Sequence, residues 1–197
     1  MHSNLTSQLT KIAVFCGSKK GYNPTYVQAV QNLAQTLTTS DITLVYGGTK
    51  VGLMGVLADE MLRLGGEVIG VISQRLAEHF KVAHDSLTTL HVINHMYEGK
   101  HLMHLLADGF IMLPGSIGSL DEFFEMVTLQ HLGYHDKPCG ILNTNGYYNN
   151  LIKFLDHAVN EGFLPSERLS TILIEDEPQK LLEKMLEWKK QVLSLQS

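Results

Sequence analysis

Residues 109–132 contain the transition that decides the fold, and they read GFIMLPGSIGSLDEFFEMVTLQHL. The first five, residues 109–113, form a continuous apolar run, which predicts a strand buried on both faces. Residues 114–119 are rich in small side chains and predict a loop. Apolar residues then recur at helical spacing over about residues 120–132. The stretch therefore predicts a buried strand, a glycine-rich loop and a helix in direct succession.

The same alternation of short apolar runs and helical segments continues in both directions along the chain. The expected strands are 12–16, 42–46, 68–72, 87–93, 109–113, 138–142 and 171–174, and the expected helices are about 24–37, 52–64, 97–107, 120–132, 148–161 and 178–195. Buried strands that alternate with helices of this length pair in parallel through right-handed crossovers. We therefore expect a doubly wound, Rossmann-like α/β fold, a three-layer sandwich around a mostly parallel sheet.

Length and composition predict one such domain over residues 1–197, with residues 1–10 flexible. The net charge of −5 without a basic block predicts no nucleic-acid partner. No apolar stretch approaches the roughly 20 residues that span a bilayer, and the polar start, residues 1–11, lacks the apolar core of a secretion signal. Cys16 and Cys139 lie in apolar runs, which indicates reduced thiols. We therefore expect a cytoplasmic protein with no membrane partner.

Three of the predicted strands end in loops of small residues. The three loops are Gly17-Ser18, Gly47–Gly55 and Pro114–Ser119. Ligands of parallel sheets bind at the carboxyl ends of the strands, so the three loops can converge there. Glycines let backbone N–H groups turn toward an anion, and the helix after the third loop points its positive end to the same place. Ser116 and Ser119 add hydroxyl donors. The loops predict a phosphate site, although the third alone also fits an ordinary strand-to-helix turn with a serine N-cap.

Asp121 and Glu122 stand at the start of the helix that follows the third loop. Carboxylates in a first helical turn interact favourably with the helix dipole. Beside a phosphate loop, a carboxylate would also lie near the sugar of a bound nucleotide, where it can activate water or stabilise positive charge at the anomeric carbon. The chain has no P-loop motif, and its first strand is not followed by the dinucleotide fingerprint.

Residues 114–122 resemble the Pro-Gly-Gly-x-Gly-Thr-x-x-Glu signature of the LOG (lonely guy) phosphoribohydrolases, a family long labelled lysine decarboxylases. Residues 46–55 resemble the second glycine-rich segment of that family, and residues 14–18 resemble its first strand and turn. Residues 132–138 and 145–149 are similar to two further family segments. The resemblance covers about residues 12–163 in order and at matching spacing.

The resemblance implies a metal-free hydrolase that needs no cofactor. It would cleave the N-glycosidic bond of a nucleoside 5′-monophosphate, either AMP or a cytokinin riboside 5′-monophosphate, to the free base and ribose 5-phosphate. The resemblance also implies a homodimer, with the helix after the signature near the interface. Glu122 matches the catalytic glutamate of the family. Together with the three loops, the expected substrate-binding residues are Gly17, Ser18, Gly47, Gly48, Met96, Lys100, Pro114, Gly115, Ser116, Ile117, Gly118, Ser119 and Thr128.

One departure from the family concerns the site itself. Residues 96–100 match the Met-His-x-Arg-Lys segment of the family, but Gly99 stands in the position of the catalytic arginine, and Tyr97 replaces the histidine. Glycine cannot supply a planar, bidentate cation, and Lys100 is not an equivalent replacement. The loss of such a group commonly costs about 10²–10³ in rate. The alternative function is therefore a catalytically weak nucleotide-binding or sensor protein, and a third is a carrier of a larger phosphorylated cofactor such as a pterin.

Two sets of polar residues allow more than one interpretation. Glu125, one turn after Glu122, either assists the site or faces a partner subunit. Two histidine pairs are spaced for one helix face, His101 with His104 and His131 with His135. Because no Cys, Asp or Glu falls at the spacing of a metal motif, we expect surface or interface histidines rather than metal ligands.

Overall fold

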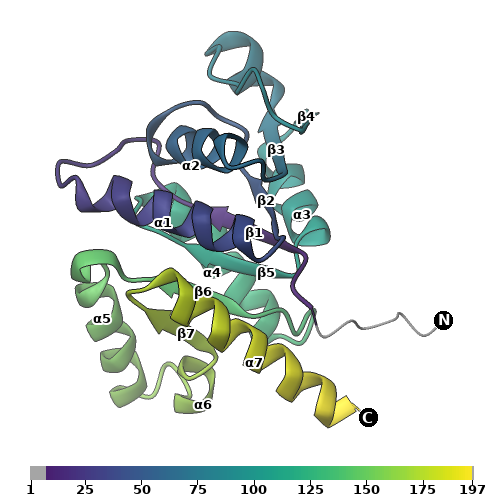
Figure 1. The fold of residues 1–197 in the computed structure, drawn as a ribbon. Helices are drawn as coiled ribbons and strands as arrows, with labels where there is room; N and C mark the ends of the chain where they lie inside the picture. The colour runs from purple at the N-terminus through teal and green to yellow at the C-terminus, as the bar shows by residue number, and fades with distance from the viewer. Residues whose placement is uncertain (1–7, 197) are drawn as a thin grey trace.

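The structure is a computed structural model that describes residues 8–196, apart from the side chains of Met96, Leu195 and Gln196. Seven strands form one sheet in the order β4-β3-β2-β1-β5-β6-β7, and each neighbouring pair is parallel (Figure 1). The strands are β1 Lys11–Phe15, β2 Thr43–Tyr46, β3 Val68–Ser73, β4 Thr89–Ile93, β5 Gly109–Met112, β6 Cys139–Leu142 and β7 Ile172–Glu175. The predicted parallel α/β fold is confirmed.

Helices cover both faces of this sheet, which gives the predicted three layers. The helices are α1 Thr25–Thr39, α2 Gly52–Arg63, α3 Met96–Leu106, α4 Ile117–His131, α5 Asn149–Asn160, α6 Ser166–Leu169 and α7 Pro178–Gln196. Alternation along β1 directs Ile12 and Val14 into a core with α1, α2 and α7, and Ala13 and Phe15 into a second core with α3, α4 and α5. Figure 1 shows α1, α2 and α7 in front of the sheet and α3 and α4 behind it.

The element boundaries differ from the expected ones where short or irregular segments occur. Helix α4 begins at Ile117, so residues 117–119 form its first turn rather than the end of the loop. A π-helical turn, η1 (Arg75–His79), and the four-residue α6 were not predicted, because segments this short carry no periodic apolar pattern. Within the described residues, no helix combines the length and apolarity that a membrane span needs.

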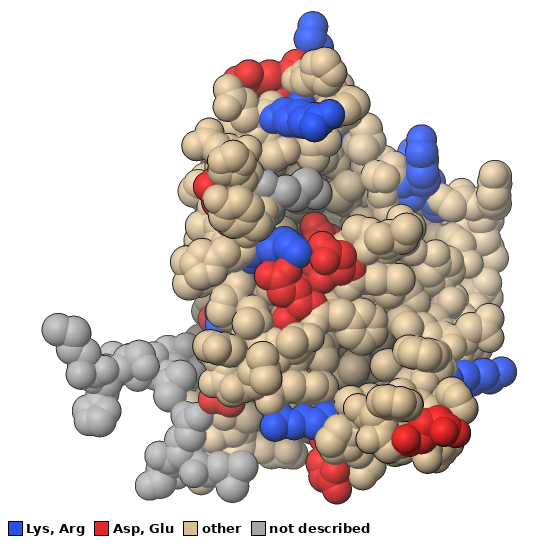
Figure 2. Space-filling view, turned by 180° about the vertical axis from the view of Figure 1, so that it is seen from behind, with Lys and Arg blue, Asp and Glu red and all other residues tan. Residues whose placement is uncertain are grey.

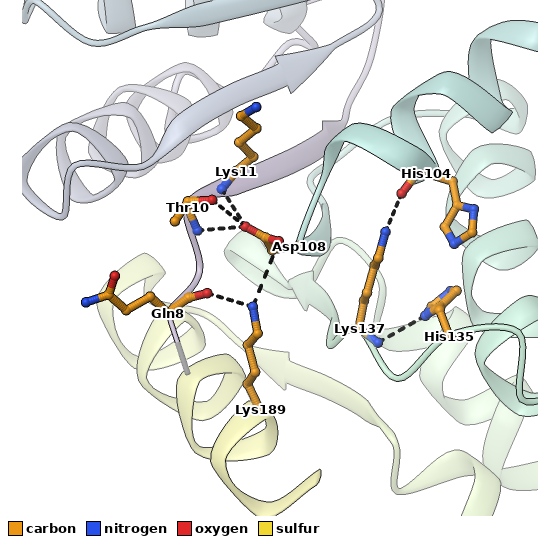
Figure 3. Close-up of polar contacts among 8 residues, drawn as sticks. All are labelled: Gln8, Thr10, Lys11, His104, Asp108, His135, Lys137 and Lys189. Carbon is orange, nitrogen blue, oxygen red and sulfur yellow. Dashed lines mark hydrogen bonds and ion pairs between the residues drawn. The ribbon is translucent and has the colours of Figure 1, made fainter. Parts of the chain in front are cut away.

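Residues 8–10 have defined partners at the amino-terminal edge of the sheet, whereas residues 1–7 lie outside the described part of the chain. Leu9 is buried. Asp108, just before β5, accepts hydrogen bonds from the Thr10 amide at 2.8 Å, the Thr10 hydroxyl at 2.7 Å and the Lys11 amide at 3.0 Å (Figure 3). Lys189 of α7 lies 3.9 Å from the same carboxylate and donates to the Gln8 carbonyl. Although burial opposes it, this set of hydrogen bonds lowers the pKa of Asp108.

A buried histidine lies at the same edge and corrects one expectation. His135 bonds the Met126 carbonyl through Nε2 at 3.0 Å, and its Nδ1 accepts from the Lys137 amide at 3.1 Å. Burial, together with the nearby His104, lowers the pKa of His135 to about 4. The Lys137 ammonium reaches back to the His104 carbonyl (Figure 3). His135 is therefore a neutral core residue rather than a surface one, because the turn after α4 folds it inward.

Candidate active site

The sheet changes its direction of winding at β1, and this places the candidate site. The chain adds β2, β3 and β4 on one side of β1, and then β5, β6 and β7 on the other. The segment after β1 leads to α1 on one face, while the segment after β5 leads to α4 on the opposite face. Such a switch point opens a crevice at the carboxyl ends of the two central strands, where ligands of these sheets bind.

The three predicted loops meet at this crevice. The Gly17 amide donates to the Pro114 carbonyl at 3.0 Å, which joins the loops after β1 and β5. The Gly17 carbonyl accepts from the Leu53 amide at 2.9 Å, which joins the start of α2 to the same point. Gly115 is packed so closely that a Cβ there would lie 2.2 Å from the Ser119 hydroxyl oxygen. Only glycine fits at this position of the signature loop.

Two cavities flank the signature loop. The first has a volume of about 160 Å³ and is lined by Gly17, Ser18, Lys19, Lys20, Gly21, Tyr26, Leu53, Pro114, Gly115, Ser116 and Tyr147. The second has a volume of about 130 Å³ and is lined by Gly47, Thr49, Met54, Val71, Ile72, Ser73, Leu76, Ile93, Gly99, Lys100, Met103, Gly118, Asp121 and Glu122. The first carries lysines, hydroxyls and loop backbone, whereas the second is largely apolar with carboxylates on one side.

Glu122 is the half-buried carboxylate of the second cavity. It stands in the second turn of α4, while Phe123 beside it points into the core between α4 and the sheet. Burial raises the pKa of Glu122 to about 7, and the charges of Asp121 and Glu125 act in the same direction against Lys100. A carboxyl group that titrates near neutral pH is suited to proton transfer and to stabilising positive charge.

Lys100 of α3 connects this cavity to the outer face of α4. Its ammonium lies 3.0 Å from the Asp121 carboxylate and also pairs with Glu125. The hydrogen bond to Glu125, followed by that to Asp121, raises the pKa of Lys100 although burial opposes it. Figure 2 shows acidic side chains against a basic one near the middle of the face that carries α3 and α4, surrounded by mostly uncharged surface. The lysine is thus already neutralised by two carboxylates.

Gly99 lines the same cavity. It is buried on α3, and a Cβ there would lie 2.9 Å from Ile93 Cδ1 and 3.6 Å from Val71 Cγ1. A larger side chain at residue 99 would therefore meet the wall formed by β3 and β4, and the Ile93 side chain would have to shift. The part of the chain that the structure describes has no cluster of three or more His, Cys, Asp or Glu side chains able to hold a metal ion.

The structure brings most of the expected site residues to the two cavities. Gly17, Ser18, Pro114, Gly115 and Ser116 line the first, and Gly47, Lys100, Gly118 and Glu122 line the second.

Five expected residues lie elsewhere. Gly48 packs against the strands beside it, and Ser119 is buried beneath Gly115. Ile117 is 83% exposed at the start of α4. Thr128 lies two turns after Asp121 on the outer face of α4, where its hydroxyl donates to the Phe124 carbonyl. Met96 begins α3, and its side chain is outside the described part.

Several cavity residues were missed by the sequence reasoning. Lys19, Lys20, Tyr26 and Tyr147 line the first cavity. The two lysines directly follow the expected turn Gly17-Ser18, so their position next to a phosphate loop was an available signal. The tyrosines come from distant parts of the chain, and only the fold brings them to the loop.

Comparisons with known proteins give the family. The family model described as "Possible lysine decarboxylase" matches residues 54–185. The cytokinin riboside 5′-monophosphate phosphoribohydrolase of Rhodococcoides fascians is 44% identical over 166 residues, which are 84% of each chain. The cytokinin riboside 5′-monophosphate phosphoribohydrolase LOG5 of Arabidopsis thaliana is 40% identical over 82% of this chain and 71% of its own.

Solved structures with low identity share the fold. A molybdenum cofactor binding protein from Rippkaea orientalis superposes with a TM-score of 0.66 at 19% identity, over 91% of this chain and 96% of its own. The molybdenum cofactor carrier protein of Chlamydomonas reinhardtii gives a TM-score of 0.65 at 17% identity, over 95% of this chain and 99% of its own. At this identity the likeness is one of fold alone. The family match and the relatives with about 40% identity, in contrast, show that the chain belongs to the LOG family, whose model is described as possible lysine decarboxylase.

Proposed function

We propose that the chain hydrolyses the N-glycosidic bond of a nucleoside 5′-monophosphate, AMP or a cytokinin riboside 5′-monophosphate, to the free base and ribose 5-phosphate. The observation that carries the proposal is Glu122, a half-buried carboxyl group with a pKa near 7, beside a glycine-rich loop at the switch point of the sheet. Relatives about 40% identical over most of the chain are named as phosphoribohydrolases of this kind.

The two cavities suggest how such a nucleotide lies. The phosphate is held by the signature loop on the side of the first cavity, where Ser18, Lys19 and Lys20 add hydroxyl and ammonium donors. The ribose and base extend toward the second cavity, whose apolar wall includes Val71, Ile93 and other aliphatic side chains suited to a base. This arrangement places the anomeric carbon beside Glu122.

Glu122 then performs the hydrolytic step in its ionised form. Its carboxylate stabilises the positive charge that develops on the ribose as the bond from C1′ to the base nitrogen breaks. The same carboxylate takes a proton from a water molecule whose oxygen bonds to C1′, and this proton passes to the departing base nitrogen, which returns Glu122 to its ionised form. Lys100 stays paired with Asp121 and Glu125 and keeps the end of α3 against α4.

A second part of the proposal is that the protein is a cytoplasmic homodimer. The side chains on the outer face of α4 support the dimer. Thr128 and Glu125 lie on the outer face of α4, next to Phe124 and Leu129. At the two ends of the same helix, Ile117 and Leu132 are 83% and 67% exposed. Large apolar side chains that remain exposed around one helix are typical of a surface covered by a partner.

The test is to incubate the purified protein with AMP and with a cytokinin riboside 5′-monophosphate and to measure the released base by chromatography. We expect release by the unmutated protein and a fall of about 10²–10³ or more for Glu122→Gln. AMP should still stabilise that variant against heat, since the phosphate site is intact. Unchanged turnover by Glu122→Gln would overturn the assignment of Glu122. Binding without any product would favour a nucleotide-binding role, and Gly99→Arg would then be the next variant.

A further inference from the structure

The segment 143–149 is a rigid turn directly behind the signature loop. Hydrogen bonds between its own side chains and backbone hold it. Asn143 donates from Nδ2 to Asn149 Oδ1 at 2.8 Å and accepts the Tyr148 amide at Oδ1, also at 2.8 Å. Asn145 and Gly146 adopt left-handed backbone conformations, with φ of 53° and 67°. The turn therefore presents the two adjacent tyrosines, residues 147 and 148, in a defined orientation.

Both tyrosine hydroxyls bond the backbone of the signature loop. The Tyr148 hydroxyl donates to the Leu113 carbonyl at 2.8 Å. The Tyr147 hydroxyl donates to the Gly115 carbonyl at 2.6 Å. The Pro114 carbonyl between them accepts from the Gly17 amide at 3.0 Å. Three successive carbonyl groups of the loop are thus bound by protein donors.

The hydrogen bond to the Gly115 carbonyl determines the direction of the Ser116 amide N–H. Residues 115 and 116 are joined by a trans peptide, in which the carbonyl and the amide N–H point in opposite directions. When the Gly115 carbonyl points at the Tyr147 hydroxyl, the Ser116 N–H points away from that hydroxyl and is left for another acceptor. In the described part of the chain, no backbone or side-chain acceptor takes that N–H. It joins the unpaired amides of the first turn of α4, which starts at Ile117.

The two tyrosines differ in their access to the cavity. Tyr148 is buried, with 4% of its surface exposed, whereas Tyr147 is 43% exposed and lines the first cavity. The Tyr147 ring is held by an edge-to-face contact with Tyr26 of α1 at 5.5 Å between centroids. The hydroxyl of Tyr147 is therefore a single group at the wall of the cavity whose removal leaves the ring packing in place.

We propose that Tyr147 is a positioning residue for the substrate phosphate: its hydroxyl holds the Gly115 carbonyl so that the Ser116 N–H faces the phosphate. The inference rests on the proposed phosphate site but not on hydrolysis, because it concerns binding. Positioned donors bind an anion well because no reorganisation is needed when it arrives. Without the hydroxyl, water replaces the bond to the exposed carbonyl and the 115–116 peptide is free to turn.

The experiment compares Tyr147→Phe with the unmutated protein, using AMP and adenosine as matched ligands with and without the phosphate. We expect the KM for AMP to rise on the order of tenfold, the effect of one lost hydrogen bond, with kcat changed less than about twofold. The stabilisation against heat by adenosine should stay the same. Tyr134→Phe, which removes a hydroxyl from a 72% exposed tyrosine outside both cavities, serves as the control and should behave like the unmutated protein.

A second variant guards against an effect on folding. Tyr26→Leu removes the ring that packs on Tyr147 but leaves the hydroxyl of Tyr147 in place. We therefore expect a smaller rise in the KM for AMP than for Tyr147→Phe. If no turnover is found, the same comparison is made by heat stabilisation with AMP and adenosine, which separates a failed hydrolase assignment from a failed positioning role. An equal loss for AMP and adenosine, an unchanged KM for AMP, or a protein that AMP does not stabilise would each overturn the proposal.

Discussion

Two carboxyl groups at opposite ends of the strands, Asp108 at the amino-terminal ends and Glu122 at the carboxyl-terminal ends, have opposite surroundings. At the amino-terminal ends of the strands, Asp108 accepts three hydrogen bonds (Figure 3). Both ring nitrogens of His135 there also have partners. At the carboxyl edge, Glu122 is half-buried beside the like charges of Asp121 and Glu125. The shifts in pKa record the difference: that of Asp108 is lowered, whereas that of Glu122 is raised. Asp108 is thus stabilised in its charged form by its partners, whereas Glu122 is held at a position that disfavours its charge.

The largest effect that tests this comparison is the pH dependence of hydrolysis. If Glu122 acts as a carboxylate with a pKa near 7, the rate should fall about tenfold for each pH unit below that value and level off above it. Asp121→Asn removes a charge that raises this pKa, so its profile should shift to lower pH. Initial rates from pH 5 to 9 at saturating AMP check both statements. A rate that falls as pH rises from 5 to 7 would show that the protonated form is required.

A smaller effect is expected when the hydrogen bonds of Asp108 are lost. Asp108→Ala removes the acceptor of three hydrogen bonds, and we expect the free energy of unfolding to fall by about 2 kcal/mol. Urea denaturation measures the change, and kcat of the folded protein should stay the same. Asp85→Ala, which breaks an exposed ion pair with Lys50, is the control and should change stability by less than about 1 kcal/mol. Equal losses for the two variants would contradict the special role of Asp108.

The smallest effect is a gain in stability at Glu122. The pKa of Glu122 is near 7 in the folded protein and near 4.5 otherwise, so between these values the folded chain holds the proton more tightly. Stability contributed by this group is therefore lost as pH rises from about 4.5 to 7. We expect Glu122→Gln to raise the melting temperature by roughly 2 °C or more at pH 8 and much less at pH 4.5. A gain of the same size at both pH values would point to packing rather than charge.

The features that the sequence could predict are those set by residues close together in the chain, and the features it could not predict depend on contacts between distant residues. The seven strands and the convergence of Gly17 with Pro114 were predictable, because apolar runs and glycine loops are local signals. Glu122 was found through its spacing from the signature loop. The switch of winding at β1 brings Tyr147 and Tyr26 to that loop, and no local pattern records such a contact.

The failures have the same origin. His135 was expected at the surface or at an interface because no metal-ligand spacing was found around it, but α4 ends at His131 and the following turn buries the ring. The raised pKa of Glu122 depends on burial and on Asp121, Glu125 and Lys100 together, which only the packed structure defines. Sequence reasoning therefore singled out Glu122 as the candidate catalytic residue, while its burial and its charged neighbours are defined only by the fold.

The position of Gly99 has a consequence for the size of the cavity beside Glu122. The atom closest to a Cβ at this position is the terminal methyl of Ile93, the far end of a flexible side chain. A side chain added at residue 99 therefore meets a group that can turn aside rather than backbone. Residue 99 is thus a position at which one substitution alters the lining of the cavity while the strands and helices around it stay as they are.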